Sequence, residues 1–114
     1  MNNNIKVPYF TVCVPAYNRQ HTLKRCLDSL CDQTYKNFEV IFVDDGSTDN
    51  TKDVVNQYEN KMNIQYIKKE NGGKHTALNI GIKKAGNSEL FLILDSDDWL
   101  KSDALEKFRN TWES

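Results

Sequence analysis

Short runs of consecutive apolar residues alternate along the chain with segments in which apolar residues recur every three or four positions. The runs predict four β-strands, at 9–14, 38–43, 64–67 and 90–94. The last run, LFLIL, is unbroken, which suits a strand covered on both faces at the centre of a parallel sheet. Pro15 is expected to end the first strand, because proline has no N–H to give to a sheet ladder.

The periodic segments predict four helices. These extend over 19–31, over about 49–58, from the Gly72–Gly73 loop to Gly86, and from an N-cap at Ser102 almost to the end of the chain. Apolar residues at helical spacing predict the inner faces: Leu23, Leu27 and Leu30; Val54, Val55 and Tyr58; Leu78, Ile82 and Ala85; Leu105, Phe108 and Trp112.

The alternation of strand and helix indicates an α/β fold with right-handed crossovers between parallel strands. We predict a Rossmann-like three-layer sandwich with a mainly parallel sheet, formed by residues 9–114 as one domain after a frayed tail at 1–8. Ala77 and Gly81 would let the third helix approach the sheet closely, and Ser47 or Thr48 is expected to cap the second helix.

Composition narrows the range of partners. The chain has 114 residues and a net charge of −1, from 15 basic and 16 acidic residues, which gives no electrostatic reason to expect nucleic acid or an anionic membrane. Cys13, Cys26 and Cys31 lack paired metal-ligand spacing and fit reduced thiols. The start MNNNIK has no apolar signal-peptide core, so we expect a cytoplasmic chain, with any membrane contact made by regions outside it.

Carboxylates gather where the last predicted strand ends. Asp95, Asp97 and Asp98 follow it within four positions. Like charges ~4 Å apart repel by roughly 4 kcal/mol at an effective dielectric near 20, and a cation relieves that repulsion. Oxygen ligands suit Mg²⁺ or Mn²⁺, which commonly bridge one or two carboxylates and substrate phosphates. The alternative is a turn or helix cap.

Two other loops end at the same edge of the predicted sheet. Pro15 to Asn18 follow the first strand, and Asp44 and Asp45 follow the second. Adjacent carboxylates at a buried strand end need specific donors, and a nucleobase imide N–H or ribose hydroxyls are suitable ones. Asp45 is therefore a candidate for base recognition, with capping of the next helix as the alternative for either residue.

Four motifs together resemble family 2 glycosyltransferases of the GT-A fold: VCVPAYNR, FEVIFVDDGSTDNT, ENGGKHTALNIGI and LFLILDSDDWL. The resemblance covers nearly all of 10–100 in order. It implies the nucleotide-binding half of a GT-A domain, which binds a nucleotide-diphosphate sugar, most often a UDP-sugar, with Mn²⁺ or Mg²⁺. It also implies inverting transfer of the sugar to a hydroxyl of an unknown carbohydrate or lipid-linked acceptor.

The resemblance also implies roles for individual residues. Asp45 would accept from the uracil ring, Asp97 would approach the ribose, and Asp98 or Asp97 would ligate the metal. Lys74 would meet the base or a phosphate. The full nucleotide-binding set implied is Pro15, Ala16, Tyr17, Asn18, Asp44, Asp45, Lys74, Asp95, Ser96 and Asp97, with Asp97 and Asp98 for the metal.

The general base of an inverting transfer is not identified in this sequence. In the family it comes from the acceptor-binding half, so we expect it beyond Ser114 and expect this part alone to be inactive. The surface meant for the absent half would then expose apolar residues such as Trp99 or Trp112 and favour self-association. Alternatives are a non-catalytic nucleotide-sugar-binding module, a receiver-type signalling domain and a haloacid dehalogenase-like phosphatase.

Overall fold

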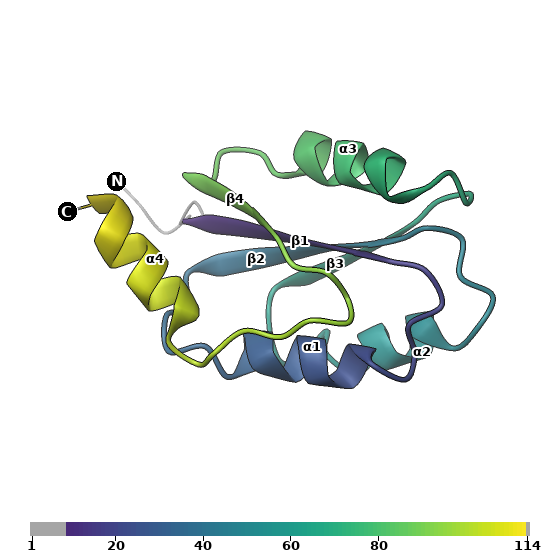
Figure 1. Ribbon diagram of the computed structural model, residues 1–114, viewed down its shortest axis with the longest axis horizontal. Helices are drawn as coiled ribbons and strands as arrows, with labels where there is room; N and C mark the ends of the chain where they lie inside the picture. The colour runs from purple at the N-terminus through teal and green to yellow at the C-terminus, as the bar shows by residue number, and fades with distance from the viewer. Residues whose placement is uncertain (1–8, 114) are drawn as a thin grey trace.

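The computed structural model describes residues 9–113, so the tail predicted at 1–8 lies outside the described residues. Its centre is a sheet of four parallel strands in the order β3-β2-β1-β4 (Figure 1). The strands are β1 (Phe10–Ala16), β2 (Phe38–Asp44), β3 (Ile64–Lys68) and β4 (Leu90–Ile93). The predicted α/β fold with a parallel sheet is confirmed.

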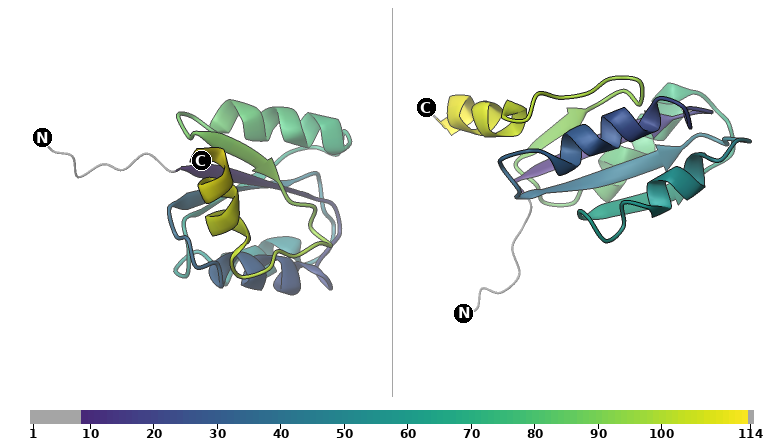
Figure 2. Two further views of the ribbon diagram at one scale, coloured as in Figure 1. Left: turned by 60° about the vertical axis from the view of Figure 1, so that its left-hand side comes forward. Right: turned by 90° about the horizontal axis from the view of Figure 1, so that it is seen from below.

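Helices cover both faces of the sheet. Figures 1 and 2 show α1 (Leu23–Cys31) and α2 (Thr51–Asn56) on one face and α3 (Lys74–Lys84) on the other. α4 (Ala104–Glu113) lies beside the end of the sheet where β1 begins (Figure 1). There the guanidinium carbon of Arg109 lies 5.6 Å from the ring centre of Tyr9 and 5.4 Å from that of Tyr35.

Two apolar cores follow from the alternation of side chains along the strands. Phe10, Val12 and Val14 face α1 and α2 within the larger core. Cys13 and Ala77 belong to a second, smaller core beneath α3. The predicted close approach of α3 is seen at Gly81, where an added Cβ would lie 3.6 Å from Phe91 Cζ and in steric conflict with the sulfur of Cys13.

The prediction that 90–94 is the central strand is wrong. Among residues 9–113, β4 pairs only with β1 and forms an edge of the sheet, and Ile93 is 51% exposed. An unbroken apolar run is typical of a buried strand, but it does not show whether a neighbouring strand lies on each side or whether every residue is covered. β1 occupies the interior position instead, together with β2.

Pro15 does not end β1, which continues to Ala16. The backbone of Cys13 points towards β4, because its carbonyl accepts from Leu94 N at 2.9 Å. Two residues on, Pro15 points the same way, but the pairing with β4 stops at Cys13. The missing N–H of the proline therefore costs no ladder hydrogen bond.

The helices begin or face differently from the prediction at several points. α1 starts at Leu23, because 20–22 form a turn, and α2 has Asn50 as its N-cap rather than Ser47 or Thr48. α3 buries Ala77 and Gly81, whereas Ile82 is exposed. α4 buries only Leu105, and Phe108 and Trp112 are 48% and 61% exposed.

None of the helices within residues 9–113 has the length and apolar character that crossing a membrane requires.

Candidate functional site

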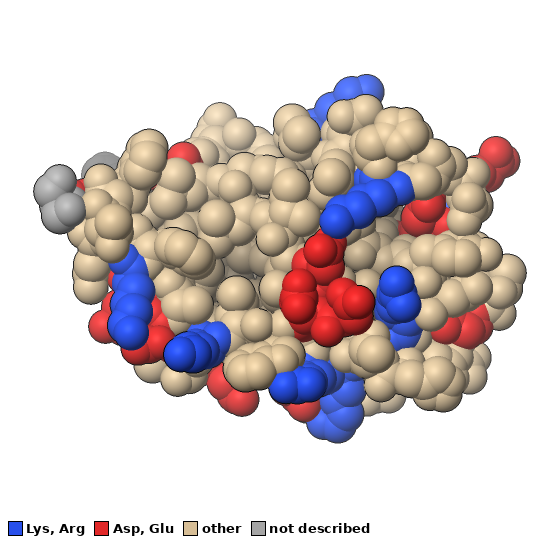
Figure 3. Space-filling view, in the orientation of Figure 1, with Lys and Arg blue, Asp and Glu red and all other residues tan. Residues whose placement is uncertain are grey.

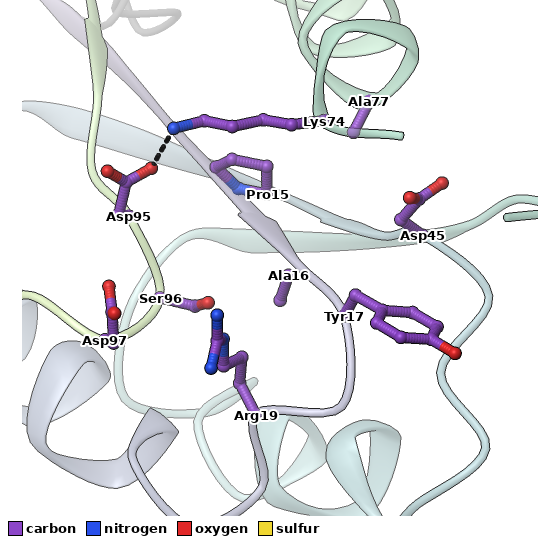
Figure 4. A pocket seen from close by; sticks show the side chains of 10 residues that line it. All are labelled: Pro15, Ala16, Tyr17, Arg19, Asp45, Lys74, Ala77, Asp95, Ser96 and Asp97. Carbon is purple, nitrogen blue, oxygen red and sulfur yellow. Dashed lines mark hydrogen bonds and ion pairs between the residues drawn. The ribbon is translucent and has the colours of Figure 1, made fainter. Parts of the chain in front are cut away.

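A pocket of about 300 Å³ lies at the edge where β1, β2 and β4 end. Its lining residues are Pro15, Ala16, Tyr17, Arg19, Asp45, Lys74, Ala77, Asp95, Ser96 and Asp97 (Figure 4). Figure 3 shows carboxylates gathered beside lysine and arginine side chains on one face of the molecule. Eight residues of the predicted nucleotide-binding set thus lie together, whereas Asn18, Asp44 and Asp98 are outside the lining.

Asp45 is held by donors from two later segments of the chain. Its Oδ1 accepts from Lys69 Nζ at 2.7 Å and from Gly72 N at 2.9 Å, and its Oδ2 accepts from Gly73 N at 2.9 Å. Burial by itself raises the pKa of Asp45, but these three hydrogen bonds lower it below the ordinary value of an aspartate. The side chain is therefore a fixed, ionised carboxylate in the pocket wall.

Asp44 lies outside the lining of the pocket. It is buried, and its carboxylate accepts from Ser47 N at 2.8 Å and from the hydroxyl of Tyr66. The hydrogen bond from Ser47 N forms a tight turn after β2 of the kind an aspartate side chain commonly makes. Its assignment to nucleotide binding stays a prediction.

Asn18 joins the loops after β1 and β2. It has a positive φ of 52°, its N–H donates to Ser47 Oγ at 2.9 Å, and its Oδ1 accepts from Thr48 N at 2.8 Å and from Asp49 N at 3.3 Å. Asparagine tolerates this left-handed backbone better than most residues. Asn18 therefore fixes Tyr17 and Arg19 on either side of it at the pocket.

Two basic side chains line the pocket, one in an ion pair and the other without a salt bridge to residues 9–113. Lys74, the first residue of α3, places Nζ 2.5 Å from Asp95 Oδ1, an ion pair that links α3 to the end of β4 (Figure 4). The guanidinium of Arg19 points towards Ser96 (Figure 4) and forms no salt bridge with any residue of 9–113. The sequence pattern missed Arg19, because it was assigned to the first helix.

The loop that carries Asp95, Ser96 and Asp97 is fastened to α1. Thr22, Cys26, Ser29 and Gln33 lie on one side of α1 and its flanking turns, and we call them the α1 seam. The contacts of the seam are Thr22 Oγ1 to Ser96 O at 3.3 Å, Cys26 Sγ to Asp95 O at 3.8 Å, Leu100 N to Ser29 Oγ at 3.1 Å, Gln33 Nε2 to Lys101 O at 2.7 Å and Leu105 N to Gln33 Oε1 at 3.0 Å.

Asp97 and Asp98, the two predicted metal ligands, do not belong to a preformed metal site within residues 9–113. Among residues 9–113, no group of three or more His, Cys, Asp or Glu side chains could hold a metal ion. Asp97 lines the pocket and Asp98 is exposed beside it. Burial, with the nearby charges of Asp98 and Asp97, raises the pKa of Cys26 to about 12, so this thiol stays protonated. The two carboxylates fit Mg²⁺ or Mn²⁺ only with further oxygens from a phosphate ligand.

The sequence model of the family described as glycosyl transferase family 2 matches residues 11–114. The chain belongs to this family. The resemblance seen in the four motifs is thereby confirmed. Family membership favours the transferase hypothesis over the receiver-type and phosphatase alternatives.

Named relatives of this family 2 chain are much longer than it is. It is 44% identical over 98 residues to "Glycosyltransferase GlyA" of Streptococcus pneumoniae, which covers 84% of this chain and 14% of that protein. It is 40% identical over 102 residues to hyaluronan synthase of Pasteurella multocida, covering 89% of this chain and 10% of the synthase. The chain therefore spans a small part of the length of these relatives.

Two solved structures are similar to this chain in fold. S. aureus TarS 1-349 in complex with UDP has a TM-score of 0.87 and 34% identity, over 91% of this chain and 32% of that one. Mannosyltransferase PcManGT from Pyrobaculum calidifontis, in complex with GDP-Man and Mn²⁺, has a TM-score of 0.74 and 31% identity, over 81% and 28% of the two chains. TarS is also known in complex with UDP-GlcNAc.

Proposed function

We propose that this chain binds a nucleotide-diphosphate sugar, with UDP-sugars as the preferred class, and forms the donor-binding part of a glycosyltransferase. The observation that carries the proposal is Asp45. Its Oδ1 already accepts two hydrogen bonds, whereas its Oδ2 accepts only one from residues 9–113. Each carboxylate oxygen has two lone pairs, so Oδ2 can accept from the imide N–H of uracil. The UDP complex of the similar TarS fold supports this assignment.

The rest of the pocket suits the remainder of such a ligand. Tyr17 is 46% exposed at the lining, where its ring can contact a base. Arg19 has a guanidinium free of salt bridges within 9–113, and such a group binds phosphate oxygens bidentately. When the ligand binds, the ammonium group of Lys74 would leave Asp95 and pair with a phosphate oxygen instead.

Asp97 and Asp98 are the residues that would hold Mg²⁺ or Mn²⁺ together with the diphosphate. A bound divalent ion supplies charge neutralisation for the departing diphosphate. The Mn²⁺ complex of the similar PcManGT fold supports this use of the site. Asp95 and Ser96 hold the loop in position through the α1 seam.

Transfer itself needs a base for the acceptor hydroxyl. We assign that role to no residue of this chain, because the family resemblance implies a base from the acceptor-binding half. The chain alone is therefore expected to bind a donor without acceptor-dependent release of UDP. Acceptor-dependent turnover by residues 1–114 would show that the base has been misplaced.

Isothermal titration calorimetry with UDP and ADP, in Mn²⁺, tests the binding proposal. UDP should bind more tightly, and Asp45→Ala should erase roughly ten- to hundred-fold of the preference, because a charge-assisted hydrogen bond contributes about 1.5–3 kcal/mol. Asp53→Ala, which removes an exposed carboxylate on α2, is the matched control. Equal binding of UDP and ADP by the parent chain would contradict the proposal.

A further inference from the structure

Lys69 is an unusually enclosed lysine. Its side chain is only 15% exposed, although lysines generally keep their ammonium groups in water. Its Nζ lies 2.7 Å from Asp45 Oδ1 and also donates to the carbonyl of Glu70. The Asp45 side chain is 7% exposed, so the ion pair joins a buried carboxylate to a largely enclosed ammonium group. A buried charge is tolerated only with a partner, which makes each of the two residues dependent on the other.

The ammonium group also decides which oxygen of Asp45 faces an incoming ligand. Lys69 and Gly72 fill the two lone pairs of Oδ1, and Gly73 takes one on Oδ2. The Gly72–Gly73 turn packs tightly here, since a Cβ at Gly72 would lie 3.1 Å from Lys69 Nζ. The remaining acceptor capacity of Asp45 is therefore confined to Oδ2.

We propose that Lys69 is a positioning residue for base recognition: it occupies Oδ1 and keeps the carboxylate ionised, so that Oδ2 is presented to a nucleobase imide N–H. This inference rests on the proposed function. Lys69 does not touch the base itself. Its contribution is to selectivity between bases that carry an imide donor, such as uracil, and adenine, which lacks one.

The effect of removing the ammonium charge follows from the surroundings of Asp45. Without Lys69, burial and the pocket carboxylates Asp95 and Asp97 oppose ionisation, and only two backbone N–H groups favour it directly. Arg19 and Lys74, on the other walls of the pocket, favour ionisation from further away, whereas Asp44 and Glu70 are acidic neighbours along the chain. The pKa of Asp45 therefore rises in a Lys69→Met chain.

His75 must be kept out of the measurement. A Cβ at Gly73 would lie 3.5 Å from its Nδ1, and histidine is the side-chain type that ordinarily changes charge between about pH 5 and 8. The variants are therefore made on a His75→Gln background. Lys68→Met, which removes the exposed lysine next in sequence, is the matched control.

The experiment is calorimetric titration of UDP and of ADP into the 1–114 chain, in Mn²⁺, from about pH 5.5 to 8. Lys69→Met should weaken UDP binding by about tenfold or more, increasingly as the pH falls, while ADP binding changes by less than about threefold. Lys69→Arg should restore most of the UDP preference, because it returns a cation. If circular dichroism shows that Lys69→Met is unfolded, Lys69→Gln replaces it with the same expected direction.

The outcomes separate this inference from the function on which it rests. Failure of the parent chain to prefer UDP over ADP would overturn the proposed function and the role of Lys69 with it. A parent that prefers UDP, together with a charge-free Lys69 variant that keeps the same preference and the same pH profile as Lys68→Met, would overturn the role of Lys69 alone. An equal loss of UDP and ADP binding would also overturn it, since that result indicates a merely structural role.

Discussion

Replacing Gly81 by alanine adds one methyl group where α3 lies against β1. At an exposed helical position this change stabilises a protein by about 1 kcal/mol, because alanine has a higher helix propensity than glycine. Gly81 is buried, however, and the new Cβ would lie 3.3 Å from Cys13 Cβ and in steric conflict with Cys13 Sγ. Overpacking of this kind costs about 1–3 kcal/mol. We therefore expect a net loss of about 1 kcal/mol, opposite in sign to the propensity effect.

Cys13, whose sulfur is in steric conflict with the added methyl group, provides the test. Cys13→Ala removes the sulfur, so in that background Gly81→Ala should become neutral or stabilising, with a coupling energy of about 1–3 kcal/mol. The free energy of unfolding is measured by urea denaturation of the four chains of the double-mutant cycle. Asn79→Ala, at an exposed position of α3, controls for propensity alone and should stabilise slightly.

A stabilisation of about 1 kcal/mol by Gly81→Ala in the parent chain would refute the reasoning. It would mean that α3 is not seated on Cys13 as described. The seating matters for the site, because α3 carries Lys74 at its first turn.

Three further predictions concern charged residues. Lys74→Ala should change the free energy of unfolding by less than about 1 kcal/mol, because the ion pair of Lys74 with Asp95 is exposed. The same substitution should weaken UDP binding in calorimetry. A large loss of stability would contradict this prediction. Asp45→Asn should make the free energy of unfolding fall less steeply as the pH is lowered into the acid range. The measurement is urea denaturation at successive pH values. The reason is that the folded-state pKa of Asp45 is lowered, so its contribution is complete above an unfolded value of about 3.9 and is lost as the pH falls through the folded value. EDTA and Asp98→Asn should each weaken UDP binding, and metal-independent binding in both would refute the assignment of Asp98.

The sequence pattern was sufficient for the fold class and for most of the pocket, because both depend on local signals. Apolar runs mark the strands, and the polar residues that follow them converge wherever parallel strands share an edge. Tyr17, Asp45 and Asp97 were placed together by this argument alone. The pattern could not order the strands, which is why β4 was assigned to the centre.

The remaining errors involve contacts between segments that are distant in sequence. The ion pair of Asp45 joins residues 24 positions apart, and nothing near Lys69 in the sequence indicates that its side chain is enclosed. Arg19 was assigned to a helix that begins four residues later, at Leu23, and the intervening turn leaves it free to reach the pocket. Helical spacing gave Phe108 and Trp112 an inward face, but spacing does not show whether a packing partner exists.

The α1 seam holds the acidic wall of the pocket independently of the wall that carries Lys74. Five hydrogen bonds tie segment 95–105 to α1, so the acidic wall is a fixed floor that moves only if the helix moves with it. The opposite wall is fixed by Gly72 N and Gly73 N, which donate to Asp45, and by the packing of α3 on the sheet, and the exposed ion pair from Lys74 joins it to the acidic wall. The bridge that this ion pair forms between the two walls should weaken as the salt concentration rises, since an exposed ion pair is screened by dissolved ions.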